Sequence, residues 1–136
     1  MGVVSIFFSA SLFFSPFFSQ TGDAAFYFQK GTVEFDNAMY SYAEENLSRA
    51  ILLDPSLFRA YEMLGDIRLR QERRHEALAF YDRSLSENEL QDRVHFKAGE
   101  IEDFFINNAK ALAHFVRACE LNQSNVYAAA GAARVL

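Results

Sequence analysis

The chain has 136 residues, a formal net charge of −5, fifteen Phe and no Trp. This length allows one domain with a substantial core and is too short for two ordinary domains. Basic residues are scattered through an acidic chain, which argues against a nucleic-acid partner, because proteins that bind nucleic acids carry a basic stripe or patch.

Residues 1–22 contain no charged side chain, and the apolar run from Val3 to Phe18 is interrupted only by serines, Ala10 and Pro16. This composition predicts a signal peptide or an uncleaved membrane anchor, and therefore an exported, periplasmic or membrane-anchored protein. The run lacks a basic n-region and a clear cleavage site, and it is shorter than the about 20 residues of a spanning helix. A mis-assigned start codon or an apolar disordered leader is the alternative, and it would place the protein in the cytoplasm.

From Ala24 onward, apolar residues recur at helical spacing to the end of the chain. Pro55 is expected to end the first pair of helices, because proline has no amide proton and disfavours helix in the residue before it. Asp92 is expected to be the N-cap of the third pair. The predicted helices cover residues 24–37, 38–52, 58–71 and 74–86, then a pair that begins at Asp92 and turns at Asn107-Asn108, and a last helix from about 126 to 136.

A shift of 34 residues brings similar residues into the same places in three units, 24–57, 58–91 and 92–125. Small residues at two of these positions would let the helix axes approach closely, while larger residues fill the gaps. The fourth position of the units holds Tyr27, Tyr61 and His95, the eighth Gly31, Gly65 and Gly99, the twentieth Ala43, Ala77 and Ala111, and the twenty-fourth Leu47, Tyr81 and Phe115.

This register resembles the tetratricopeptide repeat (TPR) family over residues 24–125. The resemblance implies an all-α fold, an α-solenoid of about three helix-turn-helix units, with a domain at 23–136 that ends in a partial fourth unit at 126–136. At the eleventh position the chain departs from the family, which often has an aromatic residue where this chain has Glu34, Arg68 and Glu102.

The resemblance also implies a concave groove lined by the first helix of each unit. Phenylalanines and charges of both signs would line it, which suits an extended peptide with apolar anchors and some charge. We therefore expect a non-catalytic protein–protein interaction scaffold that binds a partner peptide or helix. The candidate groove residues are Phe28, Thr32, Phe35, Arg59, Glu62, Asp66, Arg70, Arg93, Phe96, Lys97 and Glu100.

One TPR subclass grips the C-terminal carboxylate of chaperones with a set of Lys, Asn and Arg side chains. Arg93 and Lys97 suit two places of that clamp. Phe28, Thr32 and Met63 stand where the clamp has Lys or Asn. Because a solvated helix face supplies two such matches by chance, the chaperone clamp is not predicted.

Two other functions remain open at this point. The groove could hold a lipid or another hydrophobic ligand as a carrier at a membrane, or the chain could be the N-terminal TPR part of a larger enzyme. The short, apolar last helix predicts either self-association through it or a longer repeat array. No catalytic, cofactor or metal site is predicted, since His75, His95 and His114 lie one per helix without the short spacing of zinc ligands.

Overall fold

The computed structural model describes residues 23–136. The predicted leader at residues 1–22 lies outside the described residues, so export or membrane anchoring through it stays a prediction. The described part is all α-helical, as predicted, and contains no strand. In chain order the helices are α1 (Ala24–Asp36), α2 (Tyr40–Leu53), α3 (Phe58–Arg70), α4 (Arg74–Glu87), α5 (Asp92–Phe104), α6 (Asn108–Leu121) and α7 (Val126–Val135).

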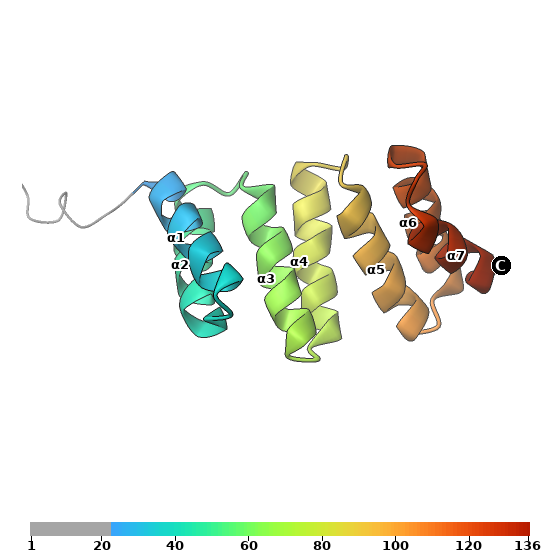
Figure 1. Ribbon diagram of the computed structural model, residues 1–136, viewed down its shortest axis with the longest axis horizontal. Helices are drawn as coiled ribbons and strands as arrows, with labels where there is room; N and C mark the ends of the chain where they lie inside the picture. The colour runs from blue at the N-terminus through green and yellow to red at the C-terminus, as the bar shows by residue number, and fades with distance from the viewer. Residues whose placement is uncertain (1–22) are drawn as a thin grey trace, which may run out of the picture.

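The helices stand side by side in chain order, from α1 at one end of an elongated molecule to α6 and α7 at the other (Figure 1). The most extensive packing is within the pairs α1–α2, α3–α4 and α5–α6, and successive pairs meet through α2–α3, α4–α5 and α6–α7. Because neighbouring elements in the chain are neighbours in space, the fold is a linear array rather than a closed bundle.

Within each pair, a glycine of the first helix lies against a large side chain of the second. Tyr81 of α4 is fully buried, and a Cβ atom built on Gly65 would lie only 2.5 Å from its Cε1. Phe115 of α6 contacts two glycines, since Cβ atoms on Gly99 and Gly131 would each lie 2.8 Å from its Cε1. Side chains do not approach so closely, so glycine is required at these points.

The space between successive pairs is filled by one pattern, used twice. Two residues of a second helix pack against three residues of the next first helix: Ala43 and Leu47 against Ala60, Leu64 and Ile67, and Ala77 and Tyr81 against Val94, Ala98 and Ile101.

Both ends of the array leave apolar side chains exposed. Phe26 and Val33 of α1 are 53% and 54% exposed, whereas the residues at the equivalent positions of α3 and α5 are buried. At the other end, Tyr127 and Leu136 are 74% and 89% exposed. Self-association through α7 stays a prediction.

The helices α1, α3 and α5 are each followed by a turn with one left-handed residue at the equivalent position. After that residue, a backbone N–H bonds to the carbonyl five residues earlier, as Met39 does to Glu34 at 2.8 Å, which is a Schellman motif. The left-handed residues are Ala38, Glu72 and Ile106, with φ of 59°, 60° and 61°.

These turns move two predicted boundaries, and a third boundary shifts in the connection before α5. The second helix begins at Tyr40 and not at Ala38, because a left-handed residue cannot continue a right-handed helix. For the same reason the third turn lies at residues 105–107, and Asn108 already belongs to α6. The N-cap of α5 is Gln91, and Asp92 is its first helical residue.

The charged residues at the eleventh position of the units serve the packing of the pairs. Glu34 and Glu102 are buried, and the Arg68 side chain is 12% exposed. A charged side chain at this position can hydrogen-bond to a polar side chain of a second helix or the turn, which an aromatic ring could not do. Each residue has a polar side-chain partner: Glu34 accepts from Asn46 at 2.7 Å, Arg68 donates to Glu44 at 2.8 Å, and Glu102 accepts from Asn107 at 2.6 Å.

Replacing Gly65 by Ala tests the contact with Tyr81. In an ordinary helix this change stabilises by about 1 kcal/mol, whereas here we expect the free energy of unfolding to fall by about 1–3 kcal/mol because the added methyl group overpacks the site. Urea denaturation measures it, with the exposed Ala79→Gly in α4 as the control for helix propensity. A stabilised Gly65→Ala variant would show that the contact is loose.

Replacing Ile106 by Gly tests the strain in the third turn. A β-branched residue is strained at positive φ, and Ile106 is 81% exposed, so little burial is lost. We expect Ile106→Gly to raise the free energy of unfolding by about 1 kcal/mol. Ala38→Gly at the equivalent position should gain less, and an equal loss in both variants would contradict the explanation.

Candidate functional site

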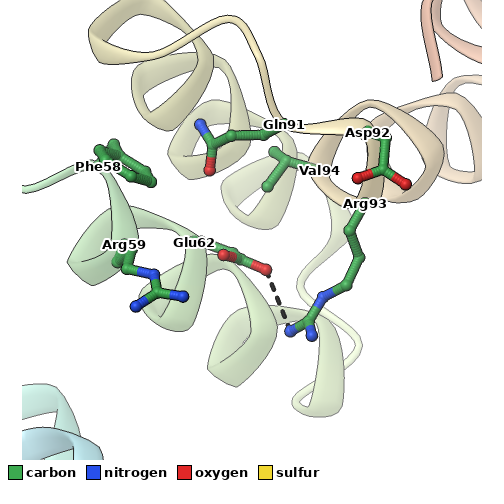
Figure 2. A pocket seen from close by; sticks show the side chains of 7 residues that line it. All are labelled: Phe58, Arg59, Glu62, Gln91, Asp92, Arg93 and Val94. Carbon is green, nitrogen blue, oxygen red and sulfur yellow. Dashed lines mark ion pairs between the residues drawn. The ribbon is translucent and has the colours of Figure 1, made fainter. Parts of the chain in front are cut away.

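Three adjoining cavities run along the first helices and share lining residues. Arg93 lines all three, Arg59 and Glu62 line the first and second, and Asp66 lines the second and third. We call them together the first-helix groove. The first cavity, drawn in Figure 2, has a volume of about 230 Å³, and the second and third have about 330 Å³ each. The first is also lined by Phe58, Gln91, Asp92 and Val94. The second is also lined by Phe28, Thr32, Phe35, Asp36 and Met63, and the third by Leu69, Arg70 and Lys97.

The groove brings together most of the candidate residues. Two candidates do not line the three cavities. The ring of Phe96 faces Phe115 and Tyr127, at centroid distances of 6.0 and 6.3 Å, and Glu100 lies on an exposed part of α5. Partner binding at any of these residues stays a prediction. The candidates that line the groove are Phe28, Thr32, Phe35, Arg59, Glu62, Asp66, Arg70, Arg93 and Lys97.

Two carboxylates of α3 and two cations of α5 form a cluster in the middle of the groove. Lys97 Nζ lies 2.6 and 2.8 Å from the two carboxylate oxygens of Asp66 and 3.3 Å from Glu62 Oε1. Arg93 lies 3.1 Å from the same oxygen of Glu62, the ion pair dashed in Figure 2. We call Glu62, Asp66, Arg93 and Lys97 the charge cluster.

The charge cluster is joined to the hydrophobic core through Tyr81. The Tyr81 hydroxyl donates a hydrogen bond of 2.6 Å to Asp66 Oδ1. Burial raises the pKa of Tyr81 far above its ordinary value, and the negative charge of Asp66 raises it further, so the hydroxyl stays protonated and remains a donor. Since the same ring packs on Gly65, one side chain fixes both the helix spacing and the carboxylate.

Aromatic rings form one wall of the groove. Phe28 and Phe35 are partly buried and pack against the core between the first two pairs. The guanidinium carbon of Arg70 lies 5.3 Å from the ring centre of Tyr40 and 6.0 Å from that of Phe35. Such cation–π contacts hold the plane of the guanidinium over the rings.

Solved structures share this arrangement of helices. The chain is similar to a crystal structure of MamA, with a TM-score of 0.78 at 17% identity over 88% of this chain and 70% of that chain. It is also similar to the first TPR of Spaghetti (RPAP3) bound to the HSP90 peptide SRMEEVD, with a TM-score of 0.75 at 16% identity over 83% and 90% of the two chains. The chain has the tetratricopeptide-repeat fold.

A third TPR-like neighbour is the Yersinia enterocolitica type III secretion chaperone SycD in complex with a peptide of the translocator YopD. Its TM-score is 0.73 at 16% identity, over 82% of this chain and 90% of that chain. No family model matches the sequence, and no curated protein sequence matches it. At such low sequence identity the similarity extends to the fold alone, so a binding site in this TPR domain has to be inferred from its own residues.

The TPR domain also contains a histidine pair that its sequence did not reveal. His95 Nδ1 and His114 Nδ1 lie 3.0 Å apart, across α5 and α6. His95 Nε2 lies 3.1 Å from the carbonyl oxygen of Glu89, which can only accept, so His95 carries its proton on Nε2 and His114 donates from Nδ1. Their separation of 19 residues hid the pair, because contact between antiparallel helices brings together residues without a short sequence spacing.

Between residues 23 and 136, no group of three His, Cys, Asp or Glu side chains is placed to hold a metal ion. None of the helices in this range is both long enough and apolar enough to cross a membrane.

A double-mutant cycle tests the charge cluster. Asp66 and Lys97 side chains are 14% and 17% exposed, so Asp66→Ala and Lys97→Ala should show a coupling of about 1–3 kcal/mol in urea denaturation. The exposed pair Glu45–Arg49 on α2 is the control, with an expected coupling below about 0.5 kcal/mol. Equal coupling in the two cycles would mean that the cluster is only a solvated surface pair.

The histidine pair makes stability depend on pH. Burial lowers the pKa of both His95 and His114 below their ordinary value of 6.5, so the unfolded chain binds more protons over this range. The contribution of the two neutral histidines to the free energy of unfolding is therefore fully present above about pH 6.5, and it is lost as the pH falls through their folded-state pKa values. The other charges that influence the pair are Glu89 and Arg117 near His95, and Asp82, Glu102 and Lys110 near His114.

Urea denaturation at pH 7.5 and 5.5 measures this loss. His95→Tyr with His114→Phe introduces the residue types that the middle unit has at these positions, and it should flatten the dependence. The exposed His75→Gln is the control that should keep it. An unchanged slope in the double variant would assign the pH dependence to other groups.

Proposed function

We propose that this TPR domain is a non-catalytic protein-interaction module that binds an extended peptide of a partner protein in the first-helix groove. The observation that carries the proposal is the continuity of the three cavities along α1, α3 and α5. Side chains from three separately packed helices line them, so the groove exists before a ligand arrives. A preformed site lowers the ordering cost of binding a flexible peptide.

Similar structures support the same kind of ligand. The RPAP3 domain holds an HSP90 peptide, and SycD holds a peptide of YopD. The groove of this chain offers partly buried rings of Phe28 and Phe35 beside charged side chains, which matches alternating apolar and polar peptide residues. A lipid carrier has less support, because each of the three cavities is lined by several charged residues, which a lipid chain would desolvate without compensation.

Selection from a random 12-residue peptide library on the full chain tests the proposal. The control for location is a pair of tryptophan variants. Thr32→Trp fills the second cavity and should abolish binding of the selected peptides, while Ser41→Trp on the exposed side of α2 should retain it. Circular dichroism confirms that both variants fold. Failure to select any peptide, or equal binding by both variants, would reject the groove as the site.

A further inference from the structure

We propose that the ligand of the first-helix groove is an acidic peptide, whose side-chain carboxylate binds the guanidinium of Arg59. This inference rests on the proposed function and goes beyond it by naming the chemical class of the peptide. The argument follows from which charges of the groove already have partners and which do not.

The charge cluster is neutral, and each of its four side chains has an ion-pair partner within it. Glu62 Oε1 receives both Lys97 and Arg93, and Asp66 receives Lys97 together with the Tyr81 hydroxyl. A ligand carboxylate at Arg93 or Lys97 would compete with carboxylates of the same chain that are already in place. These two cations are also the ones that suited a chaperone clamp, so the structure shows that carboxylates of the chain itself occupy them.

Arg59 stands apart from this cluster. It is exposed, lines the first and second cavities, and has no hydrogen-bond or ion-pair partner among residues 23–136. Figure 2 shows Arg59 and Glu62 on the same helix, with the ion pair of Glu62 directed to Arg93 and not to Arg59. Its five N–H donors are therefore available to a ligand, and a carboxylate accepts two of them at once.

Arg70 adds a second available cation in the third cavity. Its guanidinium lies over aromatic rings, which leaves its N–H edge without a carboxylate partner in the described part of the chain. Two other carboxylates line the groove: Asp92 accepts a 2.9 Å hydrogen bond from Asn122, and Asp36 is exposed. Asn122 is a neutral amide and does not balance the charge of Asp92, so the groove is lined by equal numbers of cations and carboxylates. Arg59 and Arg70 are the lining cations without an ion-pair partner in the described part of the chain, and their N–H donors are open to a ligand carboxylate.

The position of Arg59 also sets what surrounds the carboxylate. The second cavity continues from Arg59 to Phe28 and Met63, which provide an apolar surface beside the charge. An acidic residue next to an aromatic or aliphatic residue matches both features. A C-terminal carboxylate has the same chemistry as an Asp or Glu side chain, and the experiment separates the two sources.

To test this, 12-residue peptides are selected on the wild-type full chain, on the Arg59→Glu variant and on the Arg49→Glu variant, and the selected peptides are sequenced. We expect Asp and Glu beside apolar residues to be enriched on the wild-type chain and on Arg49→Glu, whose site lies on α2 outside the groove. On Arg59→Glu the acidic enrichment should disappear. Selection of peptides without acidic enrichment on the wild-type chain would overturn this inference while leaving the proposed function intact; selection of no peptide would overturn both.

Affinity measurements with one selected peptide complete the test. Replacing its acidic residue by the matching amide, or using Arg59→Glu, should weaken binding by about tenfold or more, whereas amidation of the peptide C-terminus should have little effect. Glu62→Gln frees Arg93 and should strengthen binding. If C-terminal amidation alone removes binding, or if Arg59→Glu binds as tightly as the wild type, the side-chain carboxylate does not bind Arg59.

Discussion

The contact between a glycine of each first helix and a large side chain of the following helix is the constraint on which the structure depends. At Gly65 and Tyr81 the ring occupies the space of a Cβ atom, so the two helix axes are held at one distance. Phe115 has a glycine on each side, one from its own pair and one from α7. The same contact therefore fixes both the pairing of helices and the stacking of one pair on the next.

This packing determines the groove through a short chain of contacts. Tyr81 is buried by Gly65, its hydroxyl holds Asp66, and Asp66 holds Lys97 of the next first helix. The position of Asp66 is thus fixed by a core residue. The spacing of α3 and α5 is set by the packing around Tyr81 in the core and by the ion pair between Asp66 and Lys97 in the groove. In the proposed binding mode, a ligand would meet a surface whose central charges are already paired, so the unpaired groups at its edge would select it.

The sequence predicted the fold well because the repeat carries its own packing rules. Glycine and alanine at the crossing points and large residues between them are local signals, repeated at one spacing, and helical periodicity placed most helices within two residues of their observed ends. Two turns were misplaced by one or two residues, because Ala38 and Ile106 adopt a left-handed conformation although neither is glycine. The backbone hydrogen bonds of the Schellman motif outweigh the conformational preference of these residues.

The site was harder to predict than the fold. Periodicity brought Arg59, Glu62 and Arg93 to one groove, but it could not tell which charges pair with one another. Phe96, also expected in the groove, lines none of the three cavities, and its ring lies near Phe115 of α6 and Tyr127 of α7. The contact between His95 and His114 has no sequence signature at all, since it depends on the offset between two antiparallel helices.

The most direct test of the account is a crystal structure of the full chain with a selected 12-residue peptide. We expect the peptide to run along α1, α3 and α5, with a carboxylate at Arg59 and the charge cluster unchanged. A peptide bound on the outer side of α2, α4 and α6, or one that displaces Glu62 from Arg93, would contradict the account.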